Sequence, residues 1–250
     1  KSTGNTDSAL VVQQTGNTDG WGLTPDNTNG NLDFVRIGGG AGTYFRLSVD
    51  GSLSTPTAGT SNVRFGVNAG NSIASGGNYN TVVGDEAGTA ISTGDLMTAV
   101  GYRALYAEDT GERSTAVGAY ALTAQNSAVE NYNTAVGYAA GLAVTDGVRN
   151  TLIGALAGDA LETGDNNVAL GFNALSAEVE GDRSVAIGVD ALASQTNASD
   201  TDVYNVAVGF QAGATINSGV QNTLIGGAAG DALAGGSYNV AVGYEALSSE

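Results

Sequence analysis

The sequence contains no cysteine and no histidine among its 250 residues. This absence excludes disulfides, zinc sites built from Cys and His, thiol nucleophiles and imidazole bases. Proline occurs only 2 times, phenylalanine 5 times and tryptophan once, whereas glycine occurs 39 times. Such small side chains suit thin stacked coils better than one large globular core.

Positive charge is also scarce, because 8 Lys and Arg face 25 Asp and Glu and leave a net charge of −17. A surface of this sign repels nucleic acid and anionic lipid, so we expect neither a nucleic acid nor a membrane as a partner. No apolar run approaches the ~18 residues that a membrane-spanning helix needs.

One short phrase is abundant: a hydrophobic dipeptide, a glycine, two variable residues and an alanine, as in NTAVGYAAG from Asn133. It occurs eleven times, and most copies are 17 residues apart. Its central glycines, which we expect to be structural, are Gly66, Gly84, Gly101, Gly118, Gly137, Gly154, Gly171, Gly188, Gly209, Gly226 and Gly243. A fixed period of this kind predicts a solenoid of stacked coils.

A second period lies on the first, because the residue after the phrase alanine runs Gly, Gly, Leu, Leu along the chain. Residues 150–178 also closely match residues 222–250. Duplication of a four-coil block, which lengthens a rod, accounts for both observations.

Each phrase predicts a short strand that is apolar on both faces and pairs in parallel with its neighbours. Eleven such coils make a rod about 50 Å long. We expect the larger face to stack inside the coil; it contains Val83, Val100, Val117, Val136, Ile153, Leu170, Ile187, Val208, Ile225 and Val242. We expect the smaller face to lie on a trimer axis; it contains Ala99, Ala116, Ala135, Ala169, Ala186, Ala207 and Ala241.

Residues 1–61 do not repeat, and their short apolar stretches between Gly, Asn, Asp and Thr clusters predict a small antiparallel β unit with a linker. Residues 62–250 form the repeat domain. The predicted fold is therefore all-β, a trimeric parallel β-solenoid (β-roll) of about eleven coils preceded by this unit. The asparagine four places before the glycine, present in eight copies, is expected to hydrogen-bond the backbone of the next coil.

The phrase SVAIG at Ser184–Gly188 and its NTAVG variants resemble the head repeats of trimeric autotransporter adhesins, which form a left-handed β-roll wound by three chains. The NTAVGYxAL form is also similar to repeats of bacteriophage tail fibres. Residues Tyr44–Leu53 look like the F-x-V-D-G stretches that precede the repeats in phage fibres. However, typical adhesin heads have shorter coils, and no adhesin stalk or anchor is visible.

The resemblance implies a homotrimeric structural fibre located on a virion, as part of a tail or capsid fibre. Its implied partners are a host cell-surface glycan or protein and other fibre or virion proteins. The alternative is the head of a bacterial adhesin on the cell surface. No cofactor and no enzymatic activity are expected.

Two enzyme classes remain to be weighed. Left-handed β-helix acyltransferases need three hexads a coil and a histidine base, and both are absent. A polysaccharide-degrading tailspike needs paired carboxylates, and the candidates are Glu108, Asp109 and Glu112, or Glu178, Glu180 and Asp182. Turn acids of this kind are usually solvated. With Asp200 and Asp202 they could instead bind calcium, although no known calcium loop is present.

Aromatic residues recur at regular intervals in two series. One follows the glycine, at Tyr102, Tyr138, Phe172, Phe210 and Tyr244; the other precedes the asparagine, at Tyr79, Tyr132, Tyr204 and Tyr238. Exposed rings would stack on sugars, but the regular spacing favours packing between coils. A threonine row that could bind ice is weaker still, because we expect it to be buried; it contains Thr81, Thr98, Thr115, Thr134, Thr151 and Thr223.

Overall fold

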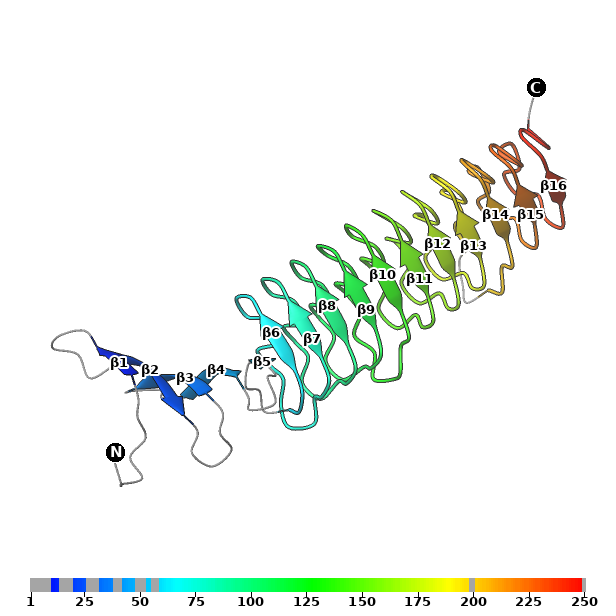
Figure 1. Ribbon diagram of the computed structural model, residues 1–250. Coiled ribbons are helices and arrows are strands. Elements are labelled where there is room, and N and C mark those ends of the chain that lie inside the picture. The colour runs from blue at the N-terminus through cyan, green and yellow to red at the C-terminus, as the bar shows by residue number, and fades with distance from the viewer. Residues whose placement is uncertain are drawn as a thin grey trace.

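The computed structural model consists of two β-sheets, which Figure 1 shows one after the other along the chain. It describes residues 10–13, 20–25, 32–37, 42–47, 53–54, 59–197 and 201–248. The described residues contain no helix, and so no helix among them could cross a membrane.

The first sheet is antiparallel, and its strands follow one another in chain order from β1 to β5. The strands are β1 (Leu10–Gln13), β2 (Gly20–Pro25), β3 (Leu32–Ile37), β4 (Gly42–Leu47) and β5 (Leu53–Ser54). This agrees with the antiparallel unit expected before the repeats.

The second sheet contains eleven parallel strands, also in chain order, one from each copy of the phrase. They are β6 (Val63–Phe65), β7 (Thr81–Val83), β8 (Thr98–Val100), β9 (Thr115–Val117), β10 (Thr134–Val136), β11 (Thr151–Ile153), β12 (Val168–Leu170), β13 (Val185–Ile187), β14 (Val206–Val208), β15 (Thr223–Ile225) and β16 (Val240–Val242). Equivalent residues pair directly, as Ala135 does with Ala116 and Leu152. The predicted parallel β-solenoid is confirmed.

The two faces of this sheet are reversed relative to our prediction. The middle residue of each strand points into the coil, and the seven alanines that we placed on a trimer axis are at most 3% exposed within one chain. These residues are Ala99, Ala116, Ala135, Ala169, Ala186, Ala207 and Ala241. The larger residues, from Val83 to Val242, lie on the outer face and are half-buried or exposed. The axis assignment of the alanines is therefore wrong.

The reason is that two positions of each coil share its interior: the middle residue of the strand and the residue after the phrase alanine. The residue after the phrase alanine is buried in every coil but the last, and coils with leucine there have alanine in the strand, as in Leu175 with Ala169. In the preceding coil glycine replaces that leucine, and Leu152 of the strand occupies the space; a Cβ added to Gly158 would lie 2.8 Å from its Cδ2. The Gly, Gly, Leu, Leu period is thus a packing period, because a close-packed interior conserves volume.

The asparagines form the predicted ladder. The Oδ1 of Asn150 accepts the backbone N–H of Asn167 in the next coil at 2.9 Å, and its Nδ2 donates to the carbonyl of Gly164 at 2.8 Å. The same pair of contacts recurs at Asn133 and Asn167. The prediction that this residue hydrogen-bonds the next coil is confirmed.

The repeat glycines allow the coils to approach one another where each strand ends. Gly154 has φ of +136°, and a Cβ there would lie 2.4 Å from the carbonyl oxygen of Gly171 in the next coil. Any other residue would be strained in this conformation and would push the coils apart. The glycine is therefore required at each step of the stack.

Candidate functional site

The outer face of the parallel sheet is uncharged over its whole length. We call the first and third residues of β6–β16 the outer strand face. The first residues are threonine or valine, and the third are Phe65, Val83, Val100, Val117, Val136, Ile153, Leu170, Ile187, Val208, Ile225 and Val242. No Asp, Glu, Lys or Arg occurs at any of these positions, although the chain carries a net charge of −17.

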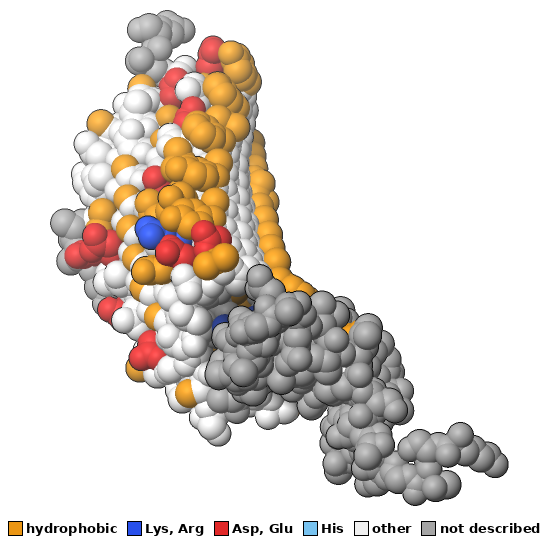
Figure 2. Space-filling model, turned by 90° about the vertical axis from the view of Figure 1, so that its left-hand side faces the viewer, with side chains coloured by type: hydrophobic (Ala, Val, Ile, Leu, Met, Phe, Trp, Pro, Cys, Tyr) orange, Lys and Arg blue, Asp and Glu red, His pale blue; other side chains and the backbone are white. Residues whose placement is uncertain are grey.

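Solvent reaches this face. Leu170 is 44% exposed and Ile225 is 41% exposed, and Thr134 and Thr151 are half-buried rather than fully buried as we expected. Figure 2 shows a continuous hydrophobic band running along the coils, with a second set of hydrophobic side chains beside it across a pale strip. An uninterrupted apolar face of this kind is typical of a surface that contacts another molecule.

A second row, which we call the aromatic row, is formed by the residue after each repeat glycine. Tyr138 is 57% exposed, Phe172 51% and Phe210 58%. Our prediction that these rings pack between coils is wrong for most of the row. Among the described residues, rings contact one another only in the third to fifth coils, where Tyr120 lies edge-on to Tyr102 and Tyr138 at centroid distances of 5.2 and 5.9 Å.

Two tyrosines of the series before the asparagine each lie in a charged cluster on the surface. Arg113 forms ion pairs with Glu112 and Glu130, and its guanidinium lies 5.7 Å from the ring centroid of Tyr132. In the duplicated block, Arg183 pairs with Asp182 and Asp202 and lies 5.7 Å from the ring centroid of Tyr204. Each cluster ties an insertion between coils to the coil before it, as the bridges between residues 112 and 130 and between residues 182 and 202 also do.

Two of the acids that we weighed as catalytic lie inside the solenoid. Glu108 is 0% exposed, and its carboxylate accepts hydrogen bonds from Gln125 Nε2 at 2.7 Å, Asn131 Nδ2 at 3.1 Å and the Gly111 N–H at 2.8 Å. The backbone N–H groups of Asp109 and Ser127 complete this set. Burial raises the pKa of Glu108, and the hydrogen bonds partly oppose this shift.

Glu178 has the equivalent environment and is also 0% exposed. It accepts from Gln195 Nε2 at 2.7 Å, from the N–H groups of Val179 and Gly181, and from both the N–H and Nδ2 of Asn197. The two glutamines also bridge to the serines that interrupt the asparagine ladder, Ser114 and Ser184. The Glu–Gln clusters are therefore internal supports of the stack.

Sequence reasoning missed these clusters, although a signal was present. Glu108 and Glu178 occupy the same position in their coils as the buried Val144, Leu161 and Ile216. A turn acid at an otherwise apolar position, repeated in both blocks, indicates an interior residue. Our expectation that these acids are solvated is wrong for both.

Four of the six acids considered for glycan cleavage are enclosed or paired with arginine. Glu108 and Glu178 are enclosed, and Glu112 and Asp182 form ion pairs with arginines. Among the described residues, no group of three or more acids is placed to hold a metal ion. Of the two further calcium candidates, Asp202 pairs with Arg183, and Asp200 lies outside the described residues.

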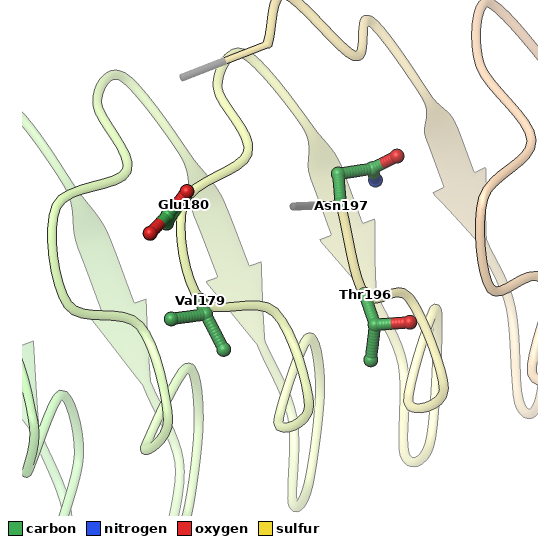
Figure 3. Close-up of a pocket in the computed structure, with 4 residues that line it drawn as sticks. All are labelled: Val179, Glu180, Thr196 and Asn197. Atoms are coloured by element: carbon green, nitrogen blue, oxygen red, sulfur yellow. The ribbon is translucent and has the colours of Figure 1, made fainter. Parts of the chain in front are cut away.

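One surface pocket lies beside the second Glu–Gln cluster, and Figure 3 shows its lining. Val179 and Glu180 come from one coil and Thr196 and Asn197 from the next, around a volume of about 240 Å³. Among the described residues, the lining contains one carboxylate, that of Glu180, and no second acid or base, which an acid–base mechanism of the tailspike type would require.

The outer strand face and the aromatic row are thus the two surfaces of the described chain best suited to contact another molecule. No known protein family, curated protein or solved structure matches the sequence or the fold of this chain.

Proposed function

We propose that this chain is a structural segment of a bacteriophage tail or head fibre, in which three copies assemble in parallel and form or present a host-receptor-binding surface. The observation that carries the proposal is the uncharged outer strand face on an otherwise acidic chain. The resemblance of the NTAVGYxAL repeats to phage tail fibres supports the viral setting.

The face is a long, narrow strip. Eleven strands at the spacing of a β-sheet give a length of about 50 Å, and the width from the first to the third strand residue is about 7 Å. The product is on the order of 350 Å², compared with the ~800 Å² that each partner contributes to a typical specific interface. Depletion of charge at the centre of a surface is the compositional mark of an interface.

The register of this face supports a trimer. Because all strands are parallel and in register, the face presents equivalent side chains at each coil. Three such faces can close a prism around a common axis, and this buries the face of each copy without leaving an open surface. The resulting rod resists bending, and repeated weak contacts on its exterior would act together on a host surface.

The mass of the protein in solution tests the proposal. Light scattering is expected to give three chain masses for the parent protein, and this mass should persist in mild denaturant. Val136→Lys combined with Ile153→Lys places charges on the outer strand face, where three copies would meet without solvent, and it is expected to give a folded monomer.

The matched control is Leu142→Lys combined with Val129→Lys, which adds the same two charges to exposed apolar residues outside the outer strand face; Leu142 is 36% exposed and Val129 is 56% exposed. This variant should remain trimeric. Circular dichroism identifies any variant that has simply unfolded. A parent protein that stays monomeric at all concentrations would overturn the proposal.

A further inference from the structure

The aromatic row alternates large and small side chains along the solenoid. From the third coil onward, rings occur in alternate coils, and the residues between them are small. The rings are Tyr102, Tyr138, Phe172, Phe210 and Tyr244, and the residues between them are Ala119, Ala155, Val189 and Gly227. The alternation separates successive rings by a non-aromatic residue, and at the last step the Tyr244 ring lies over Gly227, where an added Cβ would be 3.3 Å from its Cδ2.

Backbone hydrogen bonds fix the spacing of this row. The carbonyl of Tyr138 accepts the N–H of Leu156 in the next coil at 2.9 Å, and the carbonyl of Phe172 accepts that of Asp190 at 3.0 Å. The carbonyl of Ala155, between them, accepts the N–H of Asn173 at 3.1 Å. Successive residues of the row are therefore one strand spacing apart, and the backbone positions that carry successive rings are about 10 Å apart.

The part of the row that is open to a ligand begins at Tyr138. The Tyr102 ring is the more covered, because Arg103 lies 5.2 Å from its centroid and Tyr120 packs against it, and it is 36% exposed. The Tyr138 ring also contacts Tyr120, at 5.9 Å, but it is 57% exposed. Neither Phe172 nor Phe210 contacts another ring or a cation within the described part of the chain, and both are more than half exposed. The open row thus contains the rings of Tyr138, Phe172, Phe210 and Tyr244.

We propose that the open aromatic row binds an extended, uncharged β-1,4-linked polysaccharide, with sugar rings stacked on the aromatic rings of alternate coils. Such a glycan has a nearly twofold screw axis, so every second sugar presents the same face, and its disaccharide repeat is close to the ~10 Å between rings. Flat aromatic faces offer the apolar surface on which the C–H groups of a sugar ring stack.

Other long ligands fit this row less well. An extended peptide repeats its side chains every ~7 Å, which does not match rings ~10 Å apart. Single-stranded nucleic acid and acidic glycans are repelled by a chain with a net charge of −17. A neutral polymer avoids this repulsion.

This inference rests on the proposed function in one respect, because it names the class of host receptor that the fibre would contact. The row follows the glycine at which the strand ends, so it lies beyond the edge of the outer strand face. A trimer that closes around that face leaves the row on its exterior, and stacking on a single chain does not require the trimer.

Calorimetric titration with cellohexaose and chitohexaose tests the proposal, with maltohexaose as the sugar whose curved α-linked chain cannot follow a straight row. The parent protein is expected to bind the first two and not the third. Phe172→Ala combined with Phe210→Ala removes two neighbouring rings and should weaken binding at least about tenfold.

The control variant is Tyr79→Ala combined with Tyr238→Ala, which removes two exposed rings that lie outside the aromatic row. It should bind as the parent does. The proposal is overturned by absence of binding to both β-linked hexasaccharides at millimolar concentration, by equal binding of maltohexaose, or by an equal loss in the control.

Light scattering on the same samples separates this proposal from the proposed fibre. A monomer that binds the β-linked sugars supports the row and contradicts the trimer, whereas a trimer that binds none of them overturns the row alone. A double Phe variant that falls apart into monomers would show that the rings join copies of the chain, and this also overturns the proposal.

Discussion

The two Glu–Gln clusters, one in each duplicated block, satisfy a buried carboxylate in different ways. Both glutamates accept a glutamine side chain and three backbone N–H groups, and both also accept one asparagine amide. In the second block that amide belongs to Asn197, whereas in the first block Ser127 occupies the equivalent position. There the amide comes from Asn131, within the insertion.

The comparison shows which feature of the cluster is required. The asparagine amide, which is the fifth donor, comes from different places in the two blocks. The number of donors around the carboxylate is the same in both. The change has left Asn131 Oδ1 buried and without a hydrogen-bond partner among the described residues. A carboxylate with no cation beside it stays buried only while its donors surround it.

The largest effect is expected when the carboxylate itself is removed. Leucine has nearly the volume of glutamate and is the natural residue at the same position in the preceding coil, Leu161. Glu178→Leu should therefore leave five buried donors unpaired without opening a cavity. We expect the free energy of unfolding to fall by about 3–5 kcal/mol, measured by urea denaturation.

Glu108→Leu is expected to cost a similar amount, because its carboxylate has the same number of donors. Leu161→Met, a volume-conserving change in an apolar coil, serves as the control and should cost less than about 1.5 kcal/mol. If either Glu→Leu variant is as stable as the parent protein, the hydrogen bonds are not what maintains these two coils.

Much of this architecture could be predicted from the sequence. The repeat fixes the parallel in-register sheet, and the recurring asparagine indicates its own ladder, because a residue that returns at each coil must meet its copies. The inner and outer faces could not be assigned in the same way. Alternation shows that Ala135 and Val136 lie on opposite faces, but it does not show which one is inside.

The remaining errors have a common physical cause. Which face is inside depends on the volume that Leu122, Leu152 and similar side chains already occupy in the interior, and this is known only once the coil is closed. The same missing information made Glu108 appear to be a solvated turn acid, and it made the ring of Phe172 appear to be a packing residue.

A smaller effect is expected from the fifth donor. Asn131→Ala removes one hydrogen bond to the Glu108 carboxylate, and it also removes the unpaired Oδ1, which offsets part of the loss. The net cost should be about 1–2 kcal/mol. Adding Ser127→Asn to this variant would supply the amide from the position that Asn197 occupies in the second block, and it should restore most of the stability.

Urea denaturation of the parent protein, of Asn131→Ala and of the double variant Asn131→Ala with Ser127→Asn measures this rescue. Ser127→Asn alone, with Asn131 still present, is the control and should give no gain, because the carboxylate already has its donors. A double variant no more stable than Asn131→Ala would mean that the two positions are not interchangeable, and the equivalence drawn between the blocks would fail.

The smallest effect is expected at the surface clusters that flank the two insertions. Arg113→Gln and Arg183→Gln each break ion pairs among partly exposed side chains and remove a cation beside a tyrosine ring. Each change should cost less than about 1 kcal/mol, because exposed ion pairs are screened and their side chains lose entropy on pairing.

Salt distinguishes these surface contacts from the buried clusters. Denaturation at low and high salt should show the Arg→Gln losses shrinking as ionic strength rises, whereas the Glu→Leu losses, which arise where solvent ions do not reach, should stay unchanged. An arginine variant with a loss that is large and independent of salt would mean that the insertions are held by these clusters, and the internal carboxylates would then be secondary to them.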